Sequence, residues 1–209
     1  PNLLFSYRSQ SEDGSFSVRE FRYENGITDY VQEIVGDKAM TSIQHWQCEK
    51  KGRDRADKPE YKVRINVALT FSNQIKLTEF YHNSSFLEHG GSPERAVRQA
   101  FVSQIDSYLK QNSKYLKNES KITYADIEDC LVLVSSGFST QTSYENQTKK
   151  AITNKFIYEA MTEFLKHQIE VYFIENPDEA TRICEQILVN KRSRENAERT
   201  RLNLKKKLA

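Results

Sequence analysis

Long apolar runs are absent from this sequence of 209 residues, and no stretch approaches the ~18 consecutive apolar residues of a transmembrane helix. Hydrophobic residues make up 37% and charged residues 29% of the chain, which indicates a soluble protein more polar than an average compact domain. The chain opens on Pro1 rather than Met and shows no signal peptide. We therefore expect a processed chain or a fragment that works without a membrane.

Cysteine is scarce as well. The three cysteines, Cys48, Cys130 and Cys184, are odd in number and widely spaced, which argues against a disulfide framework and favours a reducing cytoplasm. His45 and Cys48 have the spacing of a metal-ligand pair, but no second pair accompanies them, so packing is the simpler interpretation and no metal site is expected.

Catalytic and nucleotide motifs are also missing. The sequence contains no G-x-S-x-G, H-E-x-x-H or Walker A pattern. Gly90-Gly91 lacks the spacing of a dinucleotide loop and follows no buried parallel strand, so it is interpreted as a turn. The residues taken alone therefore predict an α+β domain without a self-contained active site.

Charge is unevenly distributed although the net charge is only +2. From residue 191 to residue 209, eight basic residues face two acidic ones, so this segment carries +6 and residues 1–190 carry −4. The segment lacks an apolar stripe, which predicts a helix that crosses solvent or meets a partner. Its charge fits sequence-independent DNA binding, and a solvated helix is the other interpretation. The basic residues are Lys191, Arg192, Arg194, Arg199, Arg201, Lys205, Lys206 and Lys207.

Hydrophobic periodicity in the first half of the chain predicts strands and one short helix. Period-2 alternation marks the strands, and helical spacing followed by Gly36 marks the helix. We expect the last three strands to form an antiparallel meander. The expected strands cover residues 16–23, 41–48, 61–71 and 75–82, and the helix covers residues 27–35.

The second half predicts three helices around one apolar strand. Ser92 suits the N-cap and Pro93 the first turn of a helix. The run CLVLV, residues 130–134, has no polar alternation and is interpreted as a central strand covered on both faces. Helices are expected over residues 151–175 and again from Pro177. We expect residues 1–175 to form the core and residues 176–209 a long basic helix.

Three motifs occur in a fixed order. F-x-Y-x-x-G-I-x-x-Y-V begins at Phe21, His89-Gly90-Gly91-Ser92-Pro93 precedes a helix, and YENQTKK spans residues 144–150. Their order and spacing, together with the apolar strand and the Asn176-Pro177 helix start, resemble the transducer domain of the B subunit of bacterial DNA gyrase and topoisomerase IV. The resemblance covers nearly the whole chain. It does not separate gyrase from topoisomerase IV.

The sequence departs from that family at several of these positions. His89 replaces a Glu, Ser92-Pro93 replaces Thr-His, and Asn146 replaces a Gly in the last motif. Asn tolerates positive φ better than other non-glycine residues, so the loop shape is expected to persist. The departures point to a divergent paralogue as an alternative to the main gyrase.

The resemblance implies both a fold and a site. The fold would be the left-handed βαβ transducer fold, similar to a ribosomal-protein domain, with a mixed or antiparallel sheet, packed helices and a long protruding C-terminal helix. Lys149 would reach into the ATP pocket of a preceding domain and contact the γ-phosphate, with Gln147 assisting at the phosphate or the attacking water. Gln147, Thr148 and Lys149 would form this chain's ATP-binding set, and ATP with Mg²⁺ would be held mainly by the preceding domain.

The resemblance also implies partners. These are double-stranded DNA, a gyrase A-type subunit and a second copy of the B subunit. Contacts to DNA are expected from Lys191, Arg192, Arg194, Arg199 and Arg201. The full-length protein would be an ATP-hydrolysing type II topoisomerase, whereas residues 1–209 alone would be inactive. Two other interpretations stay open: a non-enzymatic nucleic-acid-binding module of the same fold, and a mismatch-repair or chaperone relative.

Overall fold

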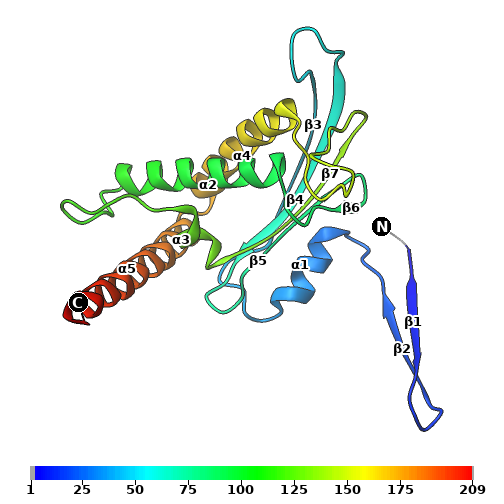
Figure 1. Cartoon of the computed structure of the whole chain (residues 1–209), viewed down its shortest axis with the longest axis horizontal. Helices are drawn as coiled ribbons and strands as arrows, with labels where there is room; N and C mark the ends of the chain where they lie inside the picture. Colours follow the sequence, from blue (N-terminus) through cyan, green and yellow to red (C-terminus); the bar gives the residue numbers. More distant parts are fainter. Residues whose placement is uncertain (1–2, 209) are drawn as a thin grey trace.

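The computed structural model describes residues 3–208. These residues form a five-stranded sheet with helices on both of its faces (Figure 1). The strands are β1 (Phe5–Gln10), β2 (Phe16–Phe21), β3 (Gln44–Gly52), β4 (Tyr61–Phe71), β5 (Leu77–His82), β6 (Ser85–Phe86) and β7 (Leu131–Ser139). The helices are α1 (Ile27–Val35), α2 (Ser92–Gln111), α3 (Tyr124–Glu128), α4 (Lys155–Glu175) and α5 (Pro177–Leu208). This is the α+β fold with a mixed sheet and a long C-terminal helix that the sequence predicts.

The strand order in the sheet is β3-β4-β7-β5-β6, which corrects one sequence prediction. The expected meander would place β5 beside β4, but β7 lies between them, antiparallel to β4 and parallel to β5. The apolar run CLVLV suits a central position, because a strand without polar alternation needs cover on both faces. The prediction that this run forms a central strand is confirmed.

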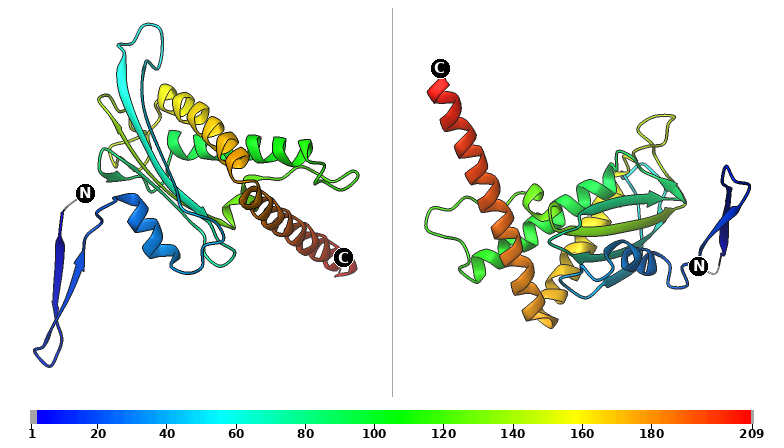
Figure 2. Two further views of the ribbon diagram at one scale, coloured as in Figure 1. Left: turned by 180° about the vertical axis from the view of Figure 1, so that it is seen from behind. Right: turned by 90° about the horizontal axis from the view of Figure 1, so that it is seen from below.

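Alternate side chains of β7 face two different helical layers. Leu131 and Leu133 join the larger core, which α2, α4 and the first turns of α5 complete. Val132 and Val134 point the other way and pack with Val31 of α1. Figure 2 shows α1 on one side of the sheet and α2 and α4 on the other.

Helix α2 begins one residue earlier than its predicted cap implies. Ser92 is already helical, and Gly91 occupies the N-cap position with φ of 84°. A Cβ at residue 91 would overlap the carbonyl oxygen of Ile152 and lie 2.8 Å from its nitrogen. Close backbone approach therefore requires glycine at this turn, and the Ser92 N-cap prediction is wrong.

Helix α4 starts at Lys155 rather than at residue 151. Ile152 lies outside the helix because its backbone forms β-bridges with both Tyr144 and Gly91. Helix α1, in contrast, has the predicted bounds, between Gly26 and Gly36.

The long helix α5 continues straight past the end of its apolar stripe. Its first turns bury Ala180, Ile183 and Ile187 in the core. Its second half projects away from the sheet (Figure 2). None of the helices in residues 3–208 combines the length and apolar character that spanning a bilayer requires.

The hairpin β1–β2 stands apart from the five-stranded sheet (Figure 1). The sequence predicts only its second strand. Several of its apolar side chains are exposed, including Phe5, Tyr7, Phe16 and Val18. The hairpin therefore contributes little to the core that supports the candidate site.

Candidate functional site

The stretch YENQTKK lies in the connection between β7 and α4, and its polar residues stand in solvent. Gln147, Thr148 and Lys149 are all exposed. A tight turn forms the tip, in which the Thr148 N–H donates to Asn146 Oδ1 at 3.1 Å and the Lys149 N–H donates to the Asn146 carbonyl at 3.3 Å. The expectation of positive φ at Asn146 is wrong: Lys149 carries it, with φ of 56°, and Asn146 shapes the turn through its side chain.

Two neighbouring lysines in this loop have different surroundings. The Lys150 ammonium pairs with Glu88. Lys149 forms no ion pair with any residue in 3–208, and its Nζ lies 5.6 Å from the centre of the Tyr144 ring. The loop thus presents one unneutralised cation at its tip.

Backbone hydrogen bonds close the loop at its base. Tyr144 and Ile152 form an antiparallel bridge, and the Thr153 N–H donates to the Ser143 carbonyl at 2.8 Å. The turn before α2 lies against the same segment, because the His89 N–H donates to the Lys150 carbonyl at 2.9 Å. The motifs at residues 89–93 and 144–150, far apart in the sequence, therefore form one structural unit.

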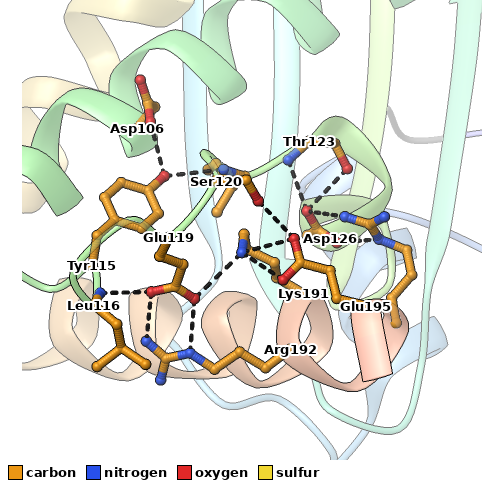
Figure 3. A network of polar contacts seen from close by, with 12 residues as sticks. Asp106, Tyr115, Leu116, Glu119, Ser120, Thr123, Asp126, Lys191, Arg192 and Glu195 are labelled. Atoms are coloured by element: carbon orange, nitrogen blue, oxygen red, sulfur yellow. Dashed lines mark hydrogen bonds and ion pairs between the residues drawn. The ribbon is translucent and has the colours of Figure 1, made fainter. Parts of the chain in front are cut away.

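The basic residues at the middle of α5 form ion pairs with carboxylates of the same chain, and Figure 3 shows those of Lys191 and Arg192. Lys191 is fully buried, with Nζ 3.3 Å from Glu119 and 2.9 Å from Glu195. Arg192 donates two hydrogen bonds of 3.0 Å to Glu119. Arg194 donates to both carboxylate oxygens of Asp126, at 2.7 and 3.2 Å. Three of the five predicted DNA contacts are thus engaged in internal ion pairs.

Two carboxylates of this network come from outside α5: Glu119 from the segment between α2 and α3, and Asp126 from α3 itself. The bidentate contact with Arg192, opposed by burial and helped by the Leu116 N–H and by Lys191, lowers the pKa of Glu119 to about 2. Burial opposes ionisation of Asp126 too, but Arg194 and Thr123 hold its pKa below the usual value. Both groups are therefore charged at neutral pH and compensate the cations of α5.

Two further contacts fasten the same segment. Ser120 Oγ donates to Glu195 at 2.7 Å, and Tyr115 donates to Asp106 at 2.8 Å. We call Glu119, Ser120 and Asp126, together with their partners on α5, the α5 clamp.

Beyond the clamp, α5 presents its basic residues to solvent. Arg199, Arg201, Lys205 and Lys206 are exposed, and Arg201 makes only a long contact of 3.8 Å with Glu198. The Lys207 side chain lies outside the described part of the chain. The two predicted DNA contacts that remain open to solvent are Arg199 and Arg201.

Both the sequence and the fold are similar to those of known proteins. The family model for DNA gyrase B matches residues 26–203. The chain belongs to the DNA gyrase B family. The B subunit of DNA gyrase from Metamycoplasma arthritidis is 30% identical over 179 residues, covering 85% of this chain and 28% of that protein. The chain therefore spans less than a third of that relative.

Solved structures of the family share the fold. The 43K ATPase domain of Thermus thermophilus gyrase B, in complex with an aminocoumarin, has a TM-score of 0.68 at 16% identity and covers 88% of this chain and 48% of that one. The topoisomerase IV ATP-binding domain of Francisella tularensis has a TM-score of 0.64 at 21% identity, covering 92% and 49%. The predicted membership of the gyrase B and topoisomerase IV B group is confirmed.

Sequence reasoning missed the acidic partners within this gyrase B family chain. Asp126 could have been found, because T-x-x-D at residues 123–126 is a capping-box pattern, and the structure forms that box. Glu119 sits in a polar loop and carries no such signal. Within residues 3–208, no group of three or more His, Cys, Asp and Glu side chains is arranged to hold a metal ion.

Proposed function

We propose that this chain is the transducer region of the B subunit of an ATP-dependent type II DNA topoisomerase. It would couple ATP binding and hydrolysis in a neighbouring ATPase domain to DNA strand passage. Residues 1–175 would form the transducer core, and residues 176–209 the basic helix that leads toward a DNA-cleaving domain. Membership of the gyrase B family supports this proposal.

The exposed cation of Lys149 carries the proposal. Phosphoryl transfer depends on positive charge placed around the γ-phosphate oxygens. Lys149 has a long flexible side chain at a loop tip and pairs with no carboxylate in residues 3–208, so it is available to a phosphate from another domain. Gln147 and Thr148, exposed on the same turn, would assist, and ATP with Mg²⁺ would be bound mainly by the neighbouring domain.

The energy of such a contact suits a switch. A charge-assisted hydrogen bond is worth roughly 1.5–3 kcal/mol, which is about a 10- to 150-fold bias between two domain orientations. Loss of the γ-phosphate after hydrolysis would remove that bias and let the transducer rotate. The base of the loop is hydrogen-bonded to the turn before α2 and leads into α4. A change in the position of the loop would therefore be transmitted to the core through these two helices.

The end of α5 would contact DNA. Arg199, Arg201, Lys205 and Lys206 are exposed and suit salt-dependent, sequence-independent contacts with a passing duplex. Lys191, Arg192 and Arg194 would instead orient the helix, since their charges are paired internally. The remaining partners would be a gyrase A-type subunit and a second copy of the B subunit, in the cytoplasm.

Substitution of Lys149 tests the proposal in the full-length protein. We expect Lys149→Ala to lower ATP turnover about 10²- to 10³-fold, because a transition-state charge contact is lost, while nucleotide binding is largely kept. The matched control is Lys155→Ala, another exposed lysine, which pairs with Glu159 on α4. Unchanged turnover in Lys149→Ala would refute the role of this lysine. The 209-residue chain alone should show no ATP turnover and no DNA relaxation.

A further inference from the structure

A buried asparagine joins the lysine loop to the start of α4. Asn154 is only 2% exposed and occupies the N-cap position of that helix. Its Oδ1 accepts the Ser143 N–H at 2.7 Å, at the base of the loop. Its Nδ2 donates to Asp54 at 2.9 Å and to the Tyr61 hydroxyl at 3.0 Å. Both polar ends of one side chain are thus used, one toward the loop and one toward the β3–β4 hairpin.

The partner carboxylate, Asp54, comes from the loop of the β3–β4 hairpin and caps α4 from outside. Its Oδ1 accepts the Phe156 N–H at 2.8 Å and the Tyr61 hydroxyl at 2.7 Å. Phe156 is the second residue of α4, so its N–H has no partner within the helix. A carboxylate at this end also interacts favourably with the helix dipole.

Tight packing of the β3–β4 hairpin places Asp54 at the start of α4. A Cβ at Gly52 would lie 2.6 Å from Cζ of Phe156, so the hairpin backbone is pressed against that ring. Tyr61 meets Phe156 edge to face, with ring centres 5.5 Å apart. The hairpin therefore fixes the start of α4 through both ring packing and hydrogen bonds.

We propose that Asp54 and Asn154 are positioning residues for Lys149, an inference that rests on the role proposed for that lysine. The Thr153 N–H donates to the Ser143 carbonyl at the base of the loop, and the Asn154 side chain accepts the Ser143 N–H. These contacts lead from the β3–β4 hairpin to the start of α4 and on to the base of the loop. They therefore hold the base of the loop from which Lys149 projects. A displacement of about 1 Å in such a group can cost about 100-fold in rate.

Hydrogen exchange in the 209-residue chain tests the anchor itself. Asp54→Ala removes the acceptor for Asn154 and for the helix N–H, and we expect the amides of Ser143, Glu145 and Thr153 to exchange about 10-fold faster. The control is Asp57→Ala on the same hairpin, where the exposed carboxylate pairs with Arg55 at 3.1 Å. Equal exchange in the two variants would overturn the inference.

The milder variant Asp54→Asn separates the two contacts. Its amide oxygen still accepts the Phe156 N–H, but its NH₂ group would face the NH₂ group of Asn154. We expect α4 amides to stay protected while the Ser143 amide exchanges faster. Protection of Ser143 equal to that of the unmodified chain would show that Asn154 holds the loop without Asp54 and would overturn the role of Asp54.

A double-substitution cycle in the full-length protein tests positioning. Asp54→Ala should lower kcat for ATP about 10-fold with KM for ATP unchanged, and should cause no further loss in a Lys149→Ala background, because both changes remove the same contact. Independent losses would overturn the inference and leave the role of Lys149 intact. If Lys149→Ala alone has normal turnover, the proposed function fails, while the exchange data still decide whether Asp54 orders the loop.

Discussion

Lys149 and Lys191 look similar in the sequence, as lysines that each stand next to another basic residue, but the fold gives them opposite environments. Lys149 stands in solvent on a loop and pairs with no carboxylate in residues 3–208. Lys191 is fully buried between Glu119 and Glu195. A cation that has no internal partner is available to a ligand, whereas a buried and paired cation stabilises the fold. The role of a basic residue therefore depends on where the acidic residues lie.

This contrast changes the meaning of the basic C-terminal segment. Its charge of +6 counts eight cations against two acids within the segment. The clamp adds Glu119 and Asp126 from the α2–α3 region, which neutralise part of that charge. The unpaired positive charge is therefore concentrated toward the end of α5.

The largest effect on stability is expected at Lys191. Lys191→Ala leaves the buried Glu119 and the Glu195 carboxylate without their shared cation, and breaking a buried pair costs about 3–5 kcal/mol. Urea unfolding of the 209-residue chain measures this change. A loss below about 1 kcal/mol, close to that of an exposed pair, would contradict a structural role for Lys191.

The pH dependence of stability tests the same clamp. Because the pKa of Glu119 is lowered to about 2, its contribution is complete above the unfolded pKa of about 4.3 and is lost as pH falls toward 2. Glu119→Gln should be less stable at pH 7 and should lose less stability between pH 5 and pH 2 than the unmodified chain. An identical acid dependence in both proteins would assign the titration to other groups.

Two arginines on α5 form a matched pair. Arg194→Ala leaves the buried Asp126 without its cation and should cost about 2 kcal/mol of unfolding free energy. Arg199→Ala should leave stability within about 0.5 kcal/mol, because this exposed arginine has no ion-pair partner in the described chain, but should weaken DNA binding and its salt dependence. Comparable destabilisation by both changes would remove the distinction between the clamp and the exposed end.

The smallest effect on stability is expected at Lys149. Lys149→Ala removes an exposed side chain, so unfolding free energy should change by less than about 0.5 kcal/mol. Thermal and urea unfolding of the 209-residue chain measure this. A loss as large as that of Lys191→Ala would mean that the loop cation supports the fold and is not free for a ligand.

Local patterns predicted those parts of the fold that depend on neighbouring residues in the chain. Helix α1 has its predicted bounds because its apolar period is flanked by Gly26 and Gly36. The central strand was predictable because CLVLV can be stable only when covered on both faces. Strand pairing was not, since the pattern of β5 does not specify whether β4 or β7 lies beside it.

The candidate site divides in the same way. The loop and its lysine were predicted from short motifs, and the structure shows how these motifs lie relative to one another. The burial of Lys191 was not predictable, because its partner Glu119 lies 72 residues away in a polar loop. Asp54 was hidden for the same reason, being 102 residues from the N–H that it accepts.

The position of the clamp along α5 limits how this helix can bend. Its contacts extend to Glu195, which also accepts a hydrogen bond from Ser120, so bending that preserves them must occur beyond that residue. The remaining part, residues 196–208, is roughly 20 Å long at about 1.5 Å per residue. The part of α5 that can bend independently is therefore short. A larger displacement of the helix end would require the core, in which the first turns of α5 are buried, to move with it.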